Sequence, residues 1–277
     1  GSCPIVITRT YTVKDLCGRS TTVSQTINVN DNTAPTISGT LPELSAEGCN
    51  VDDAPEAYTT VTALREAGLT ITDICGLQEA VTSEQTSTGS CPIVITRTYT
   101  VKDLCGNSTT VSQTININQA DFTIPADGSR TVACAIDAIA PTLPTVTDNC
   151  GTALTGSLKS GYPIVSVTDG SGTVTYKYTY ADCEQNTHDW TFVYQVVPNE
   201  FTPPTNQSVD VPCSDAVETP ITPVITVCGE NVDFGAPTIS NTVSNGCGEV
   251  GYTYNYTVNG VEYTWTYTYY VSPTPFT

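Results

Sequence analysis

The chain lacks the residues that several large classes of function require. It has no methionine, a single histidine, and only nine lysine and arginine residues against 28 aspartates and glutamates, for a formal net charge of −19. Nucleic acids and anionic membranes are therefore not expected as partners, because neither phosphate neutralisation nor a polybasic patch is available. No apolar run approaches the roughly 20 residues that a spanning helix needs, so membrane insertion is not expected either.

Residues suited to catalysis are equally scarce. His188 stands beside Asp189 in a polar stretch, and no Gly-x-Ser-x-Gly or other nucleophile motif occurs. A catalytic site needs a nucleophile, a base and an orienting group within reach of one another. We predict no enzyme activity, no catalytic residue and no organic cofactor.

Cysteine is abundant, with 12 residues and no Cys-x-x-Cys pair. With one histidine beside them, these cysteines favour disulfides over a zinc site, and disulfides indicate an oxidising, extracellular setting. Threonine, valine, isoleucine and 15 tyrosines dominate the remainder, and helical periodicity is nearly missing. The composition predicts an all-β chain of short strands and tight turns.

A long internal repeat indicates the organisation. Residues 1–30 recur at 89–118 and differ only at Arg19/Asn107 and Val29/Ile117. Such near-identity is typical of a tandem array of copied modules. Residue 1 is then expected to fall inside a module of a longer protein.

Three β-hairpins mark the modules. In the clearest, strict alternation flanks Asn259-Gly260, the strongest short-range signal for a two-residue turn. This register puts three aromatic pairs on one face: Tyr256 with Tyr263, Tyr254 with Trp265, and Tyr252 with Tyr267. Similar hairpins lie at 93–117 and 175–194. Because threonines alternate with the aromatics, we predict that the aromatics fill a sandwich core.

Similar joints follow each hairpin and set the predicted boundaries. The expected units are the C-terminal half of a module (1–30), three whole modules (31–118, 119–197 and 198–272) and the start of another (273–277). The predicted fold class is tandem β-sandwich modules arranged end to end as a rod.

Each whole module has an early cysteine and a later Cys-Gly. We predict disulfides within modules between these two positions: Cys49 with Cys75, Cys134 with Cys150, and Cys213 with Cys228.

The remaining cysteines favour bonds across the joints. Residues 93–101 form one predicted strand of roughly 30 Å at about 3.3 Å per residue, whereas a disulfide spans a Cα separation of only about 7 Å. Cys91 and Cys105 are thus expected at opposite ends of their hairpin. This predicts Cys3 with Cys105 and Cys91 with Cys183, and leaves Cys17 and Cys247 for modules outside the sequence. Local pairing of Cys91 with Cys105, and of Cys3 with Cys17, is the alternative.

One joint carries oxygen-rich residues that resemble the calcium-binding linkers of cadherins. The candidate ligands are Asn30, Asp31 and Asn32. Carboxylate and amide oxygens suit calcium. An Asx turn without a metal is the alternative.

The run from Cys91 to Asn107, with its Gln-Thr-Ile return strand and the Thr-Asp-Asn-Cys-Gly sequence at 147–151, resembles the HYR-like (hyalin-repeat-like) modules. Such modules occur in giant repetitive surface proteins of gliding Bacteroidota, including SprB-type adhesins. The resemblance implies Ig-like sandwich modules, type IX secretion and a role in adhesion or gliding motility. It does not supply a ligand.

Together these features predict a non-enzymatic extracellular stalk that spaces or presents an adhesive region at the cell surface. Its expected partners are neighbouring repeat modules of the same protein. One alternative is a filament in which Cys17 and Cys247 join neighbouring copies. Another is a carbohydrate-binding module that uses exposed tyrosine or tryptophan.

Overall fold

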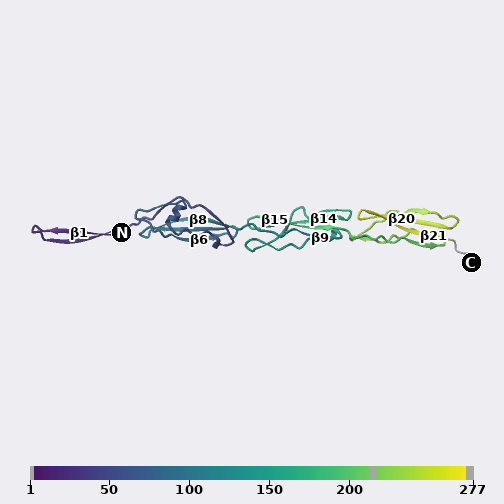
Figure 1. Cartoon of the computed structure of the whole chain (residues 1–277), viewed down its shortest axis with the longest axis horizontal. Coiled ribbons are helices and arrows are strands. Elements are labelled where there is room, and N and C mark those ends of the chain that lie inside the picture. The colour runs from purple at the N-terminus through teal and green to yellow at the C-terminus, as the bar shows by residue number, and fades with distance from the viewer. Residues whose placement is uncertain (1–2, 213–215, 273–277) are drawn as a thin grey trace. The chain divides into compact units, whose positions relative to one another are not determined.

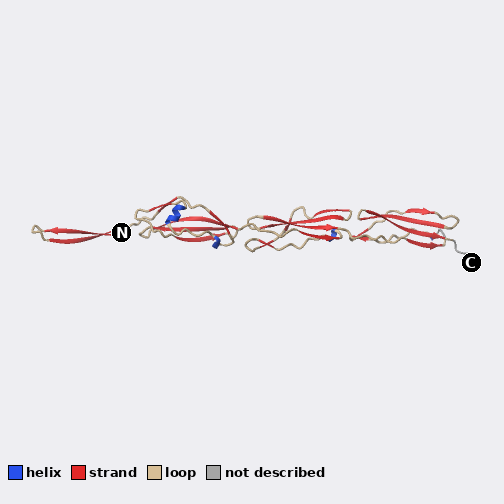
Figure 2. Ribbon diagram, in the orientation of Figure 1, coloured by secondary structure: helices blue, strands red, loops and turns tan. Residues whose placement is uncertain are grey.

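Strands make up nearly all the regular structure of the chain (Figure 2). The computed structural model describes residues 3–212 and 216–272. The helical elements with described bounds are α1 (Val61–Glu66) and two 3₁₀ turns, η1 (Val51–Asp53) and η2 (Ala135–Asp137). The all-β prediction is confirmed.

Membrane-spanning character is missing from the helices of the described residues: none is both long and apolar enough to cross a bilayer.

The chain divides into two compact units. Unit 1 comprises Gly1–Thr123, Val146–Leu154 and Ala181–Thr187, and unit 2 comprises Ile124–Thr145, Thr155–Tyr180 and His188–Thr277. The module boundaries drawn from the sequence stay a prediction, and the start of a further module at 273–277 lies outside the described residues.

Unit 1 contains a four-stranded sheet in the order β4-β8-β7-β6, of which β6 and β8 are labelled in Figure 1. Its strands are β4 (Leu44–Glu47), β6 (Thr82–Thr88), β7 (Ile93–Lys102) and β8 (Ser108–Asn118). In this sheet β6 pairs antiparallel with β7, β7 pairs antiparallel with β8, and β4 pairs parallel with β8. Two small sheets accompany it, β3 (Thr36–Ser38) with β5 (Thr70–Thr72) and β10 (Val146–Thr147) with β11 (Ala153–Leu154).

Alternation along β7 explains the core of unit 1. Ile95, Tyr99 and Val101 lie on one face of the strand and are fully buried. Tyr99 and Val101 pack with Ile71 of β5 and with Leu64 of α1, so the small β3–β5 sheet and the helix cover this face. Ile95 packs with Ile115 and Ile117 of β8 in a second cluster. The result is a two-layered β-structure.

The first two strands, β1 (Ile5–Lys14) and β2 (Ser20–Val29), form a separate two-stranded sheet. They pair with the same register as β7 and β8, from Ile5 opposite Val29 to Lys14 opposite Ser20. Almost every residue of this N-terminal hairpin is exposed.

The sheets that contribute most of unit 2 repeat the topology of β4-β8-β7-β6. One contains β9 (Gly128–Val132), β12 (Ser157–Leu158), β13 (Ile164–Thr168), β14 (Ser171–Ala181) and β15 (Thr187–Val196). The other contains β16 (Gln207–Val211), β19 (Thr238–Asn241), β20 (Gly248–Val258) and β21 (Val261–Val271), beside a small sheet of β17 (Thr226–Val227) and β18 (Glu230–Asn231). In both, the first strand lies parallel to the last.

The β20–β21 hairpin, drawn in yellow-green in Figure 1, has the predicted register. Asn259 and Gly260 form its turn with φ values of 50° and 77°, a left-handed conformation that asparagine and glycine tolerate best. Trp265 is 1% exposed in the cluster that its opposite partner Tyr254 also joins. The prediction that the aromatics form a core is confirmed.

Candidate functional site

Long-range disulfides are the most distinctive chemical feature of the described residues. Unit 1 contains Cys3–Cys105, Cys49–Cys150 and Cys91–Cys183, with Cα separations of 4.8, 5.4 and 6.0 Å. Unit 2 contains Cys134–Cys228, with a Cα separation of 5.5 Å. Each bond joins residues 92 to 102 positions apart in the sequence.

Two of these bonds are the pairs predicted across joints. Cys91 precedes β7 and Cys105 follows it, so the ten residues of this strand keep them apart. Cys105 bonds Cys3 and Cys91 bonds Cys183. These bonds exclude the local pairs, Cys91 with Cys105 and Cys3 with Cys17.

The predicted bond between Cys49 and Cys75 is wrong. Gly48 donates its backbone N–H to Asn118 at one end of β8, whereas Gly76 accepts from the backbone of Leu104 beyond the other end. The eleven residues of β8 span roughly 35 Å at about 3.3 Å per residue. Cys49 and Cys75 are therefore too far apart to bond. Cys49 bonds Cys150, and Cys75 is a free thiol.

The other two predicted bonds within modules, Cys134 with Cys150 and Cys213 with Cys228, are also wrong. Cys134 lies just beyond β9, where Val197 donates to Val132, and it bonds Cys228 rather than Cys150. This bond also excludes the predicted pair of Cys213 with Cys228, and Cys213 itself lies outside the described residues.

An aspartate shapes the hairpin turns that carry Cys105 and Cys17. Asp103 is fully buried, and its Oδ1 accepts from the backbone N–H groups of Cys105 and Asn107, both at 2.8 Å, while Oδ2 accepts from Asn107 Nδ2 at 2.7 Å. Asp15 holds Cys17 in the same way. The sequence reasoning missed these residues, although an aspartate two positions before Cys-Gly was a visible signal.

Related aspartates hold the turns around three more of the bonded cysteines. Asp148 Oδ1 accepts from the backbone of Cys150 at 2.9 Å. Asp182 holds the turn that contains Cys183, one position after it, by accepting from the N–H of Glu184 and Asn186. Cys49 donates to Asp53 Oδ2 at 2.7 Å. Cys49, Cys150 and Cys183 therefore lie on turns whose backbone is held by hydrogen bonds to an aspartate.

Replacing Asp103 with alanine is expected to destabilise unit 1 by about 1–3 kcal/mol, because buried N–H groups lose their acceptor. The loosened turn should also slow formation of Cys3–Cys105 during oxidative refolding. Acid quenching with thiol alkylation and mass spectrometry measures that rate. Asp15→Ala is the matched control, since it removes the same turn contacts from Cys17, which has no part in this bond. Equal rates in the two variants would contradict the positioning role of Asp103.

Three cysteines in the described residues are free and exposed: Cys17, Cys75 and Cys247. Cys75 has a particular environment, because hydrogen bonding to the Asp31 carboxylate raises the pKa of its thiol above the usual value. Its backbone N–H is held by Asp73 Oδ1 at 2.8 Å, which is the same contact that Asp148 makes to the bonded Cys150.

The predicted calcium ligands lie directly after β2: Asn30, Asp31 and Asn32. Asp31 forms the Asx turn, with Oδ1 accepting from the backbone of Thr33 at 2.9 Å. Ligand atoms of Asp31, Asp103 and Cys105 all lie within 4.8 Å of one another.

Two members of this cluster are already engaged by other groups. Calcium takes six to eight oxygen ligands. Cys105 Sγ is in a disulfide, and the Asp103 carboxylate already accepts three hydrogen bonds. Calcium binding at the joint stays a prediction, which calorimetric titration with calcium tests.

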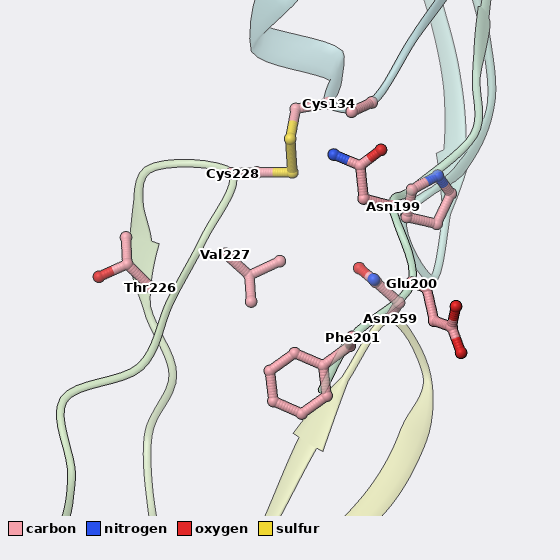
Figure 3. A pocket seen from close by; sticks show the side chains of 10 residues that line it. Cys134, Asn199, Glu200, Phe201, Thr226, Val227, Cys228 and Asn259 are labelled. Atoms are coloured by element: carbon pink, nitrogen blue, oxygen red, sulfur yellow. A yellow bond between two sulfur atoms is a disulfide. The ribbon is translucent and has the colours of Figure 1, made fainter. Parts of the chain in front are cut away.

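A cavity of about 200 Å³ lies beside the disulfide of unit 2 (Figure 3). Cys134, Cys228 and Phe201 line it, and Glu200 is the one titratable group among its described lining residues. A single carboxylate gives it no paired acid and base. The carbohydrate-binding alternative needs exposed tyrosine or tryptophan: Trp190 and Trp265 are 5% and 1% exposed and belong to the core, whereas Tyr11 and Tyr270 are both 43% exposed.

Comparison with solved structures gives matches with low similarity. They include the extracellular domain of protocadherin gamma B4 (TM-score 0.25, 12% identity, 96% of this chain and 56% of that chain) and cadherin domains 3–6 of protocadherin gamma B2 (0.28, 11%, 97% and 84%). An endo-fucoidan hydrolase of glycoside hydrolase family 107 also matches (0.27, 12%, 71% and 39%). The chain thus spans about half of the first of these proteins. At these TM-scores, none of the matches carries an inference about function.

Comparison with curated proteins gives no match. A family model does match part of the chain. The matched segment, residues 122–196, contains Cys134, Cys150 and Cys183. Its β13–β14 turn has Asp169-Gly170, whereas the equivalent β6–β7 turn has Cys91. Residues 122–196 match the family described as the HYR-like domain with 4 cysteines.

Proposed function

We propose that the chain is a load-bearing segment of an extracellular, non-enzymatic repeat protein that spaces or presents an adhesive region at a cell surface. The HYR-like match and the disulfides support this proposal. In its narrower form, the protein is a surface adhesin of the SprB type, exported by the type IX system of Bacteroidota and used in adhesion or gliding. The proposal also includes the arrangement of the modules end to end as a rod.

The covalent path through unit 1 carries the argument. Cys3 and Cys183 are 180 residues apart in the sequence, since 183 − 3 = 180. Through the two disulfides, the path runs from Cys3 to Cys105, back along the hairpin to Cys91, and on to Cys183. Its two inner cysteines, Cys105 and Cys91, are only 14 residues apart in the sequence, since 105 − 91 = 14.

This path limits how far the chain extends under tension. At about 3.5 Å per extended residue, 180 residues reach roughly 600 Å, whereas 14 residues reach roughly 50 Å. Tension applied at Cys3 and Cys183 is therefore carried by the two disulfides and by residues 91–105 between them. The rest of unit 1 is not extended by this tension. An enzyme or a soluble binding module has no evident need for such an arrangement.

Single-molecule pulling tests the proposal. Handles are attached at the N-terminus and, through a click-reactive amino acid, at position 185. The oxidised chain is expected to extend by no more than roughly 50 Å of new contour length, and the reduced chain by roughly 600 Å. Cys75→Ser is the matched control, because it removes a thiol without removing a bond. Equal extension with and without reductant would contradict the load-bearing role.

The exposed thiols of Cys17 and Cys247 favour a second candidate, a filament of chains joined by intermolecular disulfides. Non-reducing gels of the oxidised protein distinguish the two. A covalent ladder that disappears with Cys17→Ser supports the filament, and a single band supports the stalk.

A further inference from the structure

One hairpin sequence occurs twice in unit 1, in two different environments. In β7–β8, the covered hairpin, Tyr99 and Val101 are 0% exposed. In β1–β2, the N-terminal hairpin, the equivalent Tyr11 and Val13 are 43% and 61% exposed. The two copies have the same register, so the difference lies in what covers them. An isolated two-stranded hairpin is marginally stable in water, and an apolar face of this kind indicates a binding surface.

The covered hairpin shows what such a face binds. Strand β4 pairs parallel to β8, and β6 pairs antiparallel to β7. The buried polar side chains of the hairpin also find acceptors in the covering segment: Arg97 Nη1 donates to Pro55 O at 2.7 Å, and Gln113 Nε2 to Pro42 O at 2.9 Å. All these contacts come from residues 36–88.

The N-terminal hairpin already holds the matching groups in place. Tyr11 donates to Gln25 Oε1 at 3.0 Å, as Tyr99 donates to Gln113 Oε1 at 3.1 Å. Arg9 occupies the position of Arg97, exposed and with Nη1 3.5 Å from the Tyr11 hydroxyl. Its face is therefore shaped for a segment with the backbone carbonyls and apolar side chains of residues 36–88.

The free thiol of Cys75 is an independent indication. The equivalent Cys150 bonds Cys49, which follows β4 by two residues. A strand placed on β2 as β4 lies on β8 would have its last two residues beside Val29 and Asn30, because Ala46 pairs with Ile117 and Glu47 with Asn118. Val29 and Cys75 line one small cavity together with Cys3 and Cys105. A cysteine two residues past that strand would therefore arrive at Cys75.

We propose that the N-terminal hairpin accepts a preceding segment of the same polypeptide with the pattern of residues 36–88. This segment adds a parallel strand to β2 and an antiparallel strand to β1, and bonds Cys75 through a cysteine equivalent to Cys49. The connection fits, because the sequence Gly1-Ser-Cys-Pro4 repeats the Gly89–Pro92 link between β6 and β7. The inference goes beyond the proposed function and holds whether or not the protein is an adhesin.

Formation of the bond requires an oxidant. Two thiols lose two protons and two electrons, and glutathione disulfide takes them up to give two molecules of glutathione.

The test uses the full chain, extended by a second copy of residues 31–88 placed directly before Gly1. In the added copy, Cys75→Ser leaves one cysteine, the copy of Cys49. After refolding in a glutathione buffer, amide exchange in β1 and β2 is expected to slow by about 100-fold or more relative to the unextended chain. Peptide mapping should link the added cysteine to Cys75.

The matched control is an extension of the same composition in shuffled order, with its cysteine kept in place. It is expected to leave β1 and β2 fast-exchanging and Cys75 alkylatable. Equal exchange in the two extended chains, or a free Cys75 in the native extension, overturns the proposal. Protection of the hairpin that rises with concentration in the unextended chain would instead assign the face to a second copy.

Discussion

Replacing Tyr99 with alanine is expected to destabilise unit 1 by about 3–5 kcal/mol, the range for removing a fully buried aromatic side chain. The ring is 0% exposed, packs in the cluster around Leu64 and Ile71, and donates its hydroxyl to Gln113. Truncation leaves a cavity and a buried amide without its partner. Amide exchange of β7–β8 peptides in rising urea measures the loss, with β20–β21 peptides as an internal reference.

The chain supplies a control with the same local sequence. Tyr11→Ala makes the same change in the N-terminal hairpin, where the ring is 43% exposed. A substitution at such a surface is expected to change the stability of unit 1 by about 0.5 kcal/mol or less. Losses of similar size in the two variants would contradict the conclusion that covering by residues 36–88 distinguishes the two hairpins.

Removing the Cys134–Cys228 disulfide by a double change to serine is expected to cost unit 2 about 4 kcal/mol, because the bond closes a loop of close to 100 residues in the unfolded chain. The sequence separation is 94. Trp190 and Trp265, the two tryptophans of the chain, both belong to unit 2, so tryptophan fluorescence during urea unfolding follows this unit.

Two comparisons make that experiment specific. Cys75→Ser, a change of a free and exposed cysteine in unit 1, should leave the fluorescence transition unchanged. Dithiothreitol should lower the midpoint of the original chain to that of the double variant. An unchanged midpoint in the double variant would show that the bond contributes nothing to the stability of unit 2.

Local patterns predicted the hairpins well. Asn259-Gly260 fixes a two-residue turn, and from that turn the alternating side chains set every cross-strand pair, including Tyr254 with Trp265. The information lies within about twenty consecutive residues, so no tertiary contact is needed to read it.

The disulfides were predicted only in part, for a geometric reason. Cys91 and Cys105 flank one visible strand, so their separation follows from the sequence. Cys49 and Cys75 are separated by η1 and α1, and their distance depends on the parallel pairing of β4 with β8, which no local pattern shows. The same end-to-end distance argument that held for the first pair applies to the second once β4 is placed.

The parallel pairing of first and last strands also sets the order of events as the protein is made. Strand β4 cannot pair until β8 has been synthesised, so this sheet closes late and through contacts of high sequence separation, which fold slowly. The Cys49 thiol must then wait for Cys150, 101 residues further on. Until that residue emerges, Cys49 has to stay reduced or form a temporary mixed disulfide. Covalent maturation of such a chain therefore trails its synthesis, and an oxidising partner that acts too early would trap the wrong pairs.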